Sequence, residues 1–234
     1  EFNCSDNPLN TLNLEGKFLA KLKINRTNLT ALKLNYYTWM ESIQIVGNNQ
    51  LTRLEISRMP KLKELQCQNN QLTQLELSEL PALQTLYCNG NQLTQLALSD
   101  LPALRELRCN GNQMTQLDIK DLSTLGRLYC NSNQLTSLDV SENPALWDLE
   151  CSENQLTSLD VSKNLALMHL YCDDNQLTSM DVSQNTNLSF WSCDNNKFDI
   201  NIEETSRTFD LSTLPGFDVT KATNWKGGTV NGNI

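Results

Sequence analysis

The stretch that decides the fold is residues 83–94, which read LQTLYCNGNQLT. The same phrase, L-x-x-L-x-C-x-x-N-Q-L-T with small variations, returns every 21 residues through the middle of the chain. A fixed period of about 20 to 50 residues is typical of stacked-repeat architectures, in which each unit contacts only its neighbours. The sequence therefore predicts a solenoid. The cysteines that mark the period without exception are Cys67, Cys88, Cys109, Cys130, Cys151, Cys172 and Cys193.

The array extends to the N-terminus in a less regular form. Cys4, Ile24 and Ile45 occupy the cysteine position, at successive steps of 20, 21 and 22 residues. This alignment predicts about ten coils over residues 1–197. Residues 198–234 lose the period, and we expect them to form a C-terminal cap over the last coil or the start of a linker.

Each repeat contains a second phrase nested in the first, as in Leu93-x-x-Leu96-x-Leu98. Both phrases alternate apolar and polar residues with period two, which is typical of short strands with one buried face. Asn, Gly, Ser and Asp follow each phrase and favour turns. We therefore expect two short strands per coil, stacked into two parallel sheets in a right-handed, mainly β solenoid with little helix.

The cysteine position is expected to face the core, because Ile24 and Ile45 serve there equally well. In-register thiols would lie about 4.8 Å apart with parallel side-chain directions, which does not suit disulfides. No histidine or second cysteine lies nearby in the unit, so zinc and redox chemistry are not expected. Three residues further on, an asparagine is predicted to satisfy backbone groups at the corner of each coil. These asparagines are Asn70, Asn91, Asn112, Asn133, Asn154, Asn175 and Asn196.

Charge and hydropathy exclude several partners. The formal net charge is −9 and the isoelectric point is about 4.6, which argues against nucleic acids and anionic membrane surfaces. No run of 18 apolar residues occurs that would insert into a membrane. No signal peptide is visible in the first residues, where Phe2 and Cys4 already fit the repeat, so this end of the sequence does not indicate the localisation.

The unit L-x-x-L-x-C-x-x-N-Q-L-T-x-L-D-V-S-x-N-x-A resembles the bacterial leucine-rich repeats of 21 residues with nested halves, known as the IRREKO class. Residues 209–219, FDLSTLPGFDV, are similar to a segment that follows such repeats in secreted or surface-anchored bacterial proteins. The resemblance implies a leucine-rich-repeat solenoid. It also implies a secreted or cell-surface protein of adhesion or host interaction.

Function is expected where the outward positions vary. On the first sheet these positions hold tyrosines and an arginine, the residue types that dominate interface energetics. We expect them to bind a protein or glycan ligand on another cell or host. The alternative is that they shield a solvated sheet, where cross-strand aromatic pairs are favourable in any case. The predicted ligand-binding residues are Tyr87, Arg108, Tyr129, Trp147, His169 and Tyr171.

An acidic row occupies one outward position of the second phrase and is interrupted by Ala97. Carboxylates one coil apart should raise one another's pKa values, although solvent and neighbouring donors offset the repulsion. A weaker alternative is a bound cation between Asp118, Asp139, Asp160 and Asp181. The whole row is Glu55, Glu76, Asp118, Asp139, Asp160 and Asp181.

Catalysis is not expected. His169 is the single histidine and has no nucleophile at a suggestive spacing. Phosphate-binding glycine loops and zinc-protease motifs are absent from the sequence, and no cofactor is implied. The sequence thus predicts a non-enzymatic binding or adhesion protein and is compatible with a monomer. The alternative is a structural spacer that presents another domain.

Overall fold

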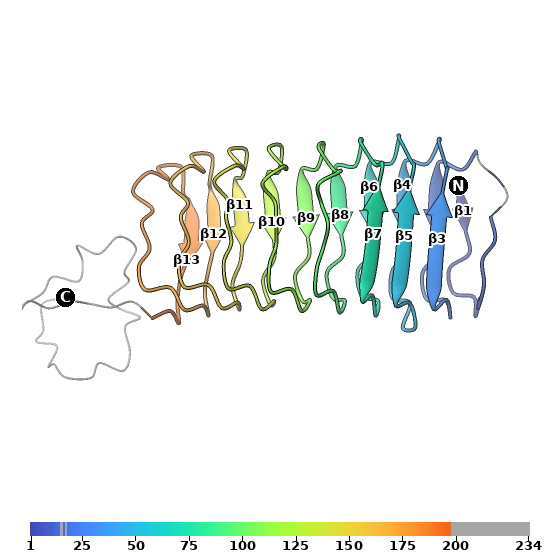
Figure 1. Ribbon diagram of the computed structural model, residues 1–234, viewed down its shortest axis with the longest axis horizontal. Helices are drawn as coiled ribbons and strands as arrows, with labels where there is room; N and C mark the ends of the chain where they lie inside the picture. The colour runs from blue at the N-terminus through green and yellow to red at the C-terminus, as the bar shows by residue number, and fades with distance from the viewer. Residues whose placement is uncertain (15, 17, 198–234) are drawn as a thin grey trace, which may run out of the picture.

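The computed structural model describes residues 1–14, 16 and 18–197, which form a rod of stacked coils (Figure 1). One parallel sheet of ten strands runs along the rod, and its order follows the order of the coils. These ten strands correspond to the ten repeat phrases, and the described residues make about nine turns of a leucine-rich-repeat solenoid. The strands are β1 (Phe2–Asn3), β2 (Lys21–Lys23), β4 (Ser42–Gln44), β6 (Glu64–Gln66), β8 (Thr85–Tyr87), β9 (Glu106–Arg108), β10 (Arg127–Tyr129), β11 (Asp148–Glu150), β12 (His169–Tyr171) and β13 (Phe190–Ser192).

The predicted C-terminal cap or linker, residues 198–234, lies outside the described residues. Among the residues described, no helix is long and apolar enough to cross a membrane.

The core is built by inward positions that recur in each repeat, among them the leucine in most strands of the ten-stranded sheet and the cysteine after it. Leu65, Leu86 and Leu107 are direct partners on β6, β8 and β9, and all three are fully buried. The residue that follows each strand, the cysteine, points to the same side because side chains alternate along an extended chain. Burial of this apolar surface is the main favourable contribution to folding. A coil on its own has no partner for its apolar faces, so it is stable only in the stack.

The cysteines are free thiols, as predicted. Six of them, from Cys67 to Cys172, are fully buried, whereas Cys4 and Cys193 in the first and last described coils are partly exposed. Burial raises the pKa of the Cys88 and Cys130 thiols to about 12. Buried, protonated thiols serve here as small apolar side chains.

The asparagine ladder is confirmed, and it joins each coil to the one before. Asn91 Nδ2 donates hydrogen bonds to the carbonyl oxygens of Cys67 at 3.0 Å and Cys88 at 2.9 Å. Asn91 Oδ1 accepts the backbone N–H of Leu72 at 3.0 Å. Each amide therefore satisfies three backbone groups that the corner would otherwise leave unpaired. The same arrangement recurs at Asn112, Asn133, Asn154, Asn175 and Asn196.

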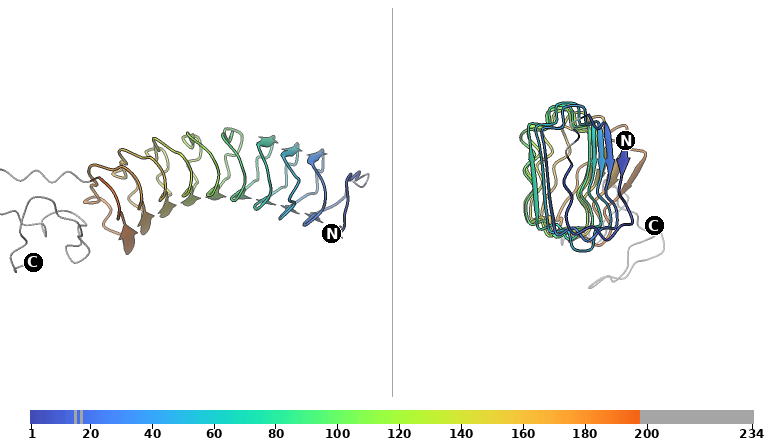
Figure 2. Two further views of the ribbon diagram at one scale, coloured as in Figure 1. Left: turned by 90° about the horizontal axis from the view of Figure 1, so that it is seen from below. Right: turned by 90° about the vertical axis from the view of Figure 1, so that its right-hand side faces the viewer.

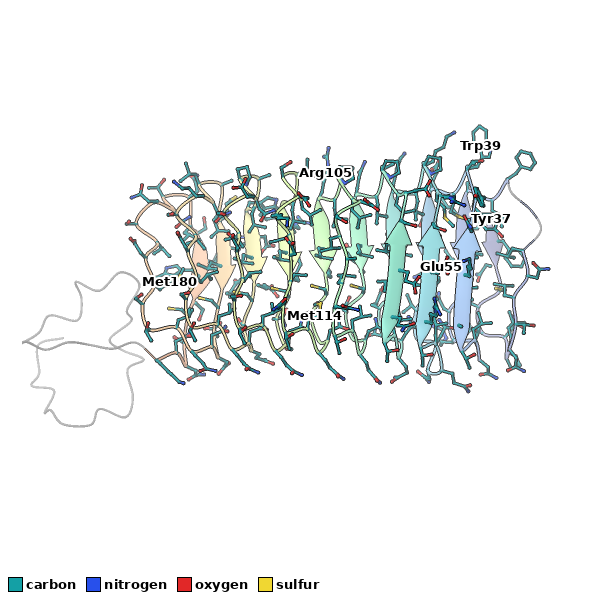
Figure 3. The ribbon with its side chains drawn as sticks, in the orientation of Figure 1. Tyr37, Trp39, Glu55, Arg105, Met114 and Met180 are labelled. Atoms are coloured by element: carbon teal, nitrogen blue, oxygen red, sulfur yellow. The ribbon has the colours of Figure 1, made fainter. Side chains whose placement is uncertain are left out.

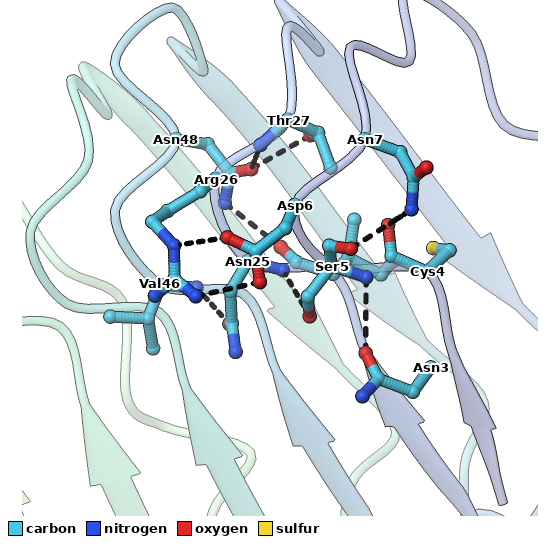
Figure 4. A network of polar contacts seen from close by, with 11 residues as sticks. Asn3, Cys4, Ser5, Asp6, Asn7, Asn25, Arg26, Thr27, Val46 and Asn48 are labelled. Atoms are coloured by element: carbon cyan, nitrogen blue, oxygen red, sulfur yellow. Dashed lines mark hydrogen bonds and ion pairs between the residues drawn. The ribbon is translucent and has the colours of Figure 1, made fainter.

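The irregular first coils keep this ladder with other residues (Figure 4). Thr27 takes an asparagine position, and its N–H and hydroxyl both donate to Asn48 Oδ1, at 2.8 and 2.7 Å. Asn48 Nδ2 in turn donates to Ile24 O at 3.0 Å. At the outer corner, Arg26 Nη2 donates to Asp6 Oδ2 at 2.7 Å. These contacts continue the stack to the first coil despite the altered sequence.

The second sheet is shorter than predicted. It contains three strands, β3 (Ala31–Asn35), β5 (Arg53–Ser57) and β7 (Gln74–Ser78). In the later coils of the described chain the second phrase forms no strand, so the prediction of two strands in every coil is wrong there. The rod is curved, with the ten-stranded sheet on its concave side and the three-stranded sheet on its convex side (Figure 2).

A change of residue type accounts for the lost strand in four of the later coils. Where β5 and β7 have Glu55 and Glu76, these coils have Asp118, Asp139, Asp160 and Asp181. The coil between, with Ala97 at this position, also forms no strand, and no Asx turn explains it. Asp139 Oδ1 accepts the N–H of Ser141 at 2.9 Å, and Asp160 Oδ1 accepts that of Ser162 at 2.8 Å. A short carboxylate that captures the N–H two residues on forms an Asx turn, which competes with the extended conformation.

Candidate binding face on the concave sheet

The side chains predicted to bind a ligand lie on five neighbouring coils of the concave sheet. Three of them are direct cross-strand partners, with Arg108 on β9 between Tyr87 on β8 and Tyr129 on β10. Trp147 directly precedes β11 and contacts His169 on β12, so these two form a second group. Tyr171 is separated from Tyr129 by Glu150, and it is not joined to either group by a described hydrogen bond or ring contact.

Arg108 lies between two aromatic rings. Its guanidinium carbon is 4.8 Å from the centroid of the Tyr87 ring and 4.7 Å from that of Tyr129. Neighbouring strands are about 4.8 Å apart, so the guanidinium fills the space between the rings, and the ring faces are directed along the sheet. Each cation–π contact contributes about 0.5–1 kcal/mol at an exposed site and more where water is excluded.

Glu106 fixes this stack from one side. Tyr87 donates its hydroxyl to Glu106 Oε1 at 2.9 Å, and Arg108 Nε donates to the same oxygen at 2.8 Å. Arg127 Nη1 donates to Glu106 Oε2 at 3.3 Å. Partial burial opposes ionisation of Glu106, but the hydrogen bonds from Arg108 and Tyr87 prevail and hold its pKa below the ordinary value. The carboxylate therefore stays charged and orders two arginines and a tyrosine.

Asp148 holds the other side of the stack. It is a buried carboxylate with 6% of its surface exposed, and it accepts the Tyr129 hydroxyl at 2.5 Å. His169 Nδ1 lies 3.8 Å from Asp148 Oδ1. Burial and the hydrogen bond to Asp148 raise the pKa of the Tyr129 hydroxyl. Burial, and then the charge of Asp148, raise the pKa of Glu150.

The second aromatic group continues the face toward β13. The Trp147 and His169 rings meet edge to face with centroids 5.9 Å apart, and His169 meets Phe190 in the same way at 5.6 Å. The Arg127 guanidinium carbon is 4.4 Å from the Trp147 ring centroid, so the two groups are linked. Phe190 is 62% exposed and Met168 is 42% exposed.

Several residues of this face were not predicted from the sequence. Glu106, Arg127 and Asp148 occupy the outward position two residues before the tyrosine and arginine row, and Phe190 follows them on β13. A signal for the first two was present, because Glu106 and Arg127 place opposite charges on adjacent repeats at the same position. Buried Asp148 carries no such signal, since its burial depends on the rings packed around it.

A different cation–aromatic grouping lies at the end of the three-stranded sheet. The Arg58 guanidinium carbon is 4.6 Å from the Tyr36 ring centroid, and Arg58 Nε donates to Glu79 Oε1 at 2.9 Å. Lys61 Nζ is 3.5 Å from the centroid of Trp39, which projects from the edge of the rod (Figure 3). This grouping provides matched controls, because it repeats the same contacts away from the concave sheet.

The acidic row behaves differently from the prediction. Hydrogen bonds from the residue two positions on hold the pKa of Asp118, Asp139, Asp160 and Asp181 below the ordinary value. In the structure the donors of the Asx turns outweigh the mutual repulsion, so the expectation of raised pKa values is wrong for these four. Among the described residues, no group of three or more His, Cys, Asp and Glu side chains is placed to hold a metal ion. The bound cation was the weaker alternative from the sequence, and calcium and a chelator can test it.

Comparison with known proteins agrees with this architecture. The family model described as "Leucine Rich repeats (2 copies)" matches residues 60–103 and 81–125. No curated protein matches the chain.

Among solved structures, the chain is similar to the functional domain of InlJ from Listeria monocytogenes, described as including a cysteine ladder. The identity is 29% and the TM-score 0.63, over 77% of this chain and 45% of that one. The internalin InlF of Listeria monocytogenes matches at 21% identity and a TM-score of 0.60, over 79% of this chain and 64% of that one. The leucine-rich repeat protein LIC12759 of Leptospira interrogans matches at 22% identity and a TM-score of 0.52, over 78% and 68%. The last two show the fold alone, and the first two proteins extend well beyond the region that matches.

Proposed function

We propose that this leucine-rich repeat protein is a non-enzymatic binding module that recognises a protein ligand through its concave sheet. The observation that carries the proposal is the stack of Tyr87, Arg108 and Tyr129, held in place by Glu106 and Asp148. Leucine-rich repeat domains generally mediate protein–protein interaction and adhesion, and the InlJ domain is a structural neighbour of this chain.

Preorganisation supports recognition over simple shielding of the sheet. The Glu106 side chain is 14% exposed, while that of Arg108 is 41% exposed, so the anchor is internal and the cation faces solvent. Tyrosine and arginine fixed in one geometry lose little conformational entropy when they bind a partner. They are also the residue types enriched among the residues that dominate binding energy. A face that merely shields the strands would not need carboxylates that fix the hydroxyls of Tyr87 and Tyr129.

The orientation of the rings favours a protein over a glycan. Sugars stack on aromatic faces that are open to solvent, but the facing sides of Tyr87 and Tyr129 are occupied by Arg108. The edges of these tyrosine rings remain for contact. Such an edge, together with an arginine, suits the mixed polar and apolar surface of a protein.

Adhesion or host interaction at a bacterial surface, or after secretion, belongs to the same proposal. The support is the resemblance of the 21-residue unit and of residues 209–219 to secreted or surface-anchored bacterial proteins. A structural spacer remains the alternative, because the repeated interlocking of coils would also give a stiff rod.

The test is a binding screen against arrays of extracellular proteins and of glycans, followed by affinity measurements with variants. The combined substitution Tyr87→Ala, Tyr129→Ala and Tyr171→Ala should weaken binding of a protein hit at least about a hundredfold, as expected for the loss of several interface anchors. The matched control is Tyr36→Ala with Trp39→Ala, which removes aromatics that are 48% and 51% exposed elsewhere on the rod.

Unfolding curves of both variants establish that the fold survives. Equal loss of affinity in both variants, or none in the first, would rule out the concave face. If only glycans bind, the ligand is a sugar and not a protein. No hit on either array, with the rod intact, would favour the spacer.

A further inference from the structure

Beyond the general proposal, the concave face changes in character along the rod, from positively charged to apolar. Its β9–β10 part presents arginines, and its β11–β13 part presents apolar and aromatic side chains. We infer that this face binds an extended segment of a partner protein that carries a carboxylate followed, three or four residues away, by a large apolar side chain. The inference rests on the proposed protein-binding function and specifies the chemistry of its partner.

The first step is the supply of free arginine donors. A guanidinium has five N–H donors. Arg127 Nη1 donates to Glu106, and Arg127 Nε is buried without a partner among the described residues, so Nη2 is the Arg127 nitrogen that makes no described hydrogen bond and is not fully buried. The Arg105 guanidinium donates to no described residue. Arg105 is exposed and lies at the edge of the rod (Figure 3). Such donors suit a carboxylate, which can accept two parallel N–H bonds from one guanidinium.

The second step is the apolar surface beside these donors. Trp147 stacks on Arg127, Met168 follows it on the next coil, and Phe190 is the outermost aromatic at 62% exposure. His169 lies between the Trp147 and Phe190 rings and makes the surface continuous. An exposed apolar surface that adjoins charged groups is typical of an interaction site.

The third step excludes a long polyanion. Glu150 and buried Asp148 lie on β11, directly after the arginines, and Asp173 follows β12. A sulfated or phosphorylated chain that ran along the rod would meet these carboxylates and be repelled. One or two carboxylates opposite Arg105 and Arg127 avoid them.

The geometry sets the spacing in the partner. From β10 to β12 and β13 there are two and three strand steps of about 4.8 Å, so Arg127 lies about 10–14 Å from the Met168 and Phe190 surface. An extended chain advances about 3.3 Å per residue, and three or four residues cover that distance.

The experiment selects random linear peptides displayed on phage against the full chain, without assuming a natural partner. Enriched sequences should share an Asp or Glu three or four residues from Phe, Trp, Leu or Met. Synthetic labelled versions are then titrated by fluorescence polarisation. Arg127→Gln and Phe190→Ser should each weaken binding about tenfold, a typical effect for an interface anchor. Phe190 is 62% exposed and the Arg127 side chain is 41% exposed, and unfolding curves of both variants check that the fold survives.

The matched control is Arg58→Gln. It removes the same charge and the same kind of contacts, with Tyr36 and Glu79, from the other side of the rod. Affinity within about twofold of wild type is expected, since this site is remote from the peptide. Raised salt should weaken the wild-type complex and affect the Arg127→Gln complex less.

Several results would overturn the inference. If the enriched peptides lack acidic residues, or if Arg127→Gln leaves their affinity unchanged, the partner does not bind through a carboxylate. If such peptides still lost binding with the Tyr87, Tyr129 and Tyr171 variant, the proposed function would stand and only this inference would fail. Heparin binding abolished by Arg127→Gln would assign the face to sulfated glycans. Self-association abolished by the same substitution would assign it to a second copy of the chain.

Discussion

The indole of Trp147 lies directly over Gly126 on the neighbouring coil. A Cβ placed on Gly126 would come within 3.1 Å of Trp147 Nε1 and 3.2 Å of its Cδ1, closer than ordinary van der Waals contact. Gly126 does not require a left-handed backbone, so its role is to leave room for the ring. This space lets Trp147 stack on Arg127 and meet His169, and it couples one glycine to the aromatic half of the concave face.

Gly126→Ala should therefore move the indole without unfolding the rod. The expected change in the free energy of unfolding is within about 1 kcal/mol, because reduced freedom of the unfolded chain offsets part of the steric cost. The indole N–H signal of Trp147 in a 15N-resolved NMR spectrum should shift, and binding at the concave face should weaken. An unmoved indole signal would show that the ring does not depend on Gly126.

The two asparagine positions of a coil should differ in their contribution to stability. Asn154 Oδ1 accepts the buried N–H of Leu135 at 3.0 Å, so Asn154→Leu leaves a buried donor unpaired. A loss of about 2–3 kcal/mol in the free energy of unfolding is expected.

Asn164→Leu should cost less than about 1 kcal/mol. Its Oδ1 is buried and has no hydrogen-bond partner among the described residues, while the carbonyls of Val140 and Asn143 that its amide contacts also accept backbone N–H groups. Leu122 occupies the same position in an earlier coil and is buried there. Urea unfolding of both variants measures the difference, and equal losses would contradict the assignment of backbone satisfaction to Asn154.

The convex aspartates should make the rod sensitive to acid. The folded-state pKa values of Asp118, Asp139, Asp160 and Asp181 are lowered by their turn hydrogen bonds. A lowered pKa stabilises the fold above the unfolded value of about 3.9, and this contribution is lost as the pH falls through the folded value. Replacing all four by asparagine keeps the acceptor oxygen but removes the ionisable carboxyl groups. The urea midpoint of this variant should fall less than that of wild type between about pH 5 and pH 2. Parallel profiles would show that these carboxyl groups have the same pKa values in the folded and unfolded chain.

Calcium and EDTA should leave the melting temperature unchanged. Each of the four aspartates uses an oxygen in its own turn, and these carboxylates are exposed to solvent. A ligand that binds the folded state raises its stability, so a bridging cation would be visible as a higher melting temperature in calcium. Such an increase, if the fourfold asparagine variant abolished it, would support a bound cation between these aspartates.

Thiol titration should separate the ends of the cysteine ladder from its middle. Cys4 and Cys193 are partly exposed and should react first with Ellman's reagent under native conditions. The six thiols from Cys67 to Cys172 should react only on unfolding, because burial excludes the reagent and disfavours the thiolate. Rapid reaction of all eight would mean that the coils open easily.

Much of the architecture could be predicted because the period specifies it. Leu86 and Cys88 repeat at one spacing, and such a repeat can bury both side chains only by stacking coils in register. The extent of the second sheet could not be predicted in this way. Glu76 and Asp139 occupy equivalent, similarly polar positions, yet the shorter aspartate closes an Asx turn on Ser141 and the strand is lost.

The candidate face was predicted as a row of residues but not as a set of contacts. The sequence by itself determined the repeat, the buried thiols, the asparagine ladder and the outward direction of Tyr87, Arg108 and Tyr129, because these follow from local alternation and a fixed period. Only the tertiary structure decided that Arg108 lies between two rings and that Asp148 is buried beneath Tyr129 and His169. Those contacts depend on side-chain directions across neighbouring coils, and residues 21 positions apart in the chain become neighbours only when the coils are stacked.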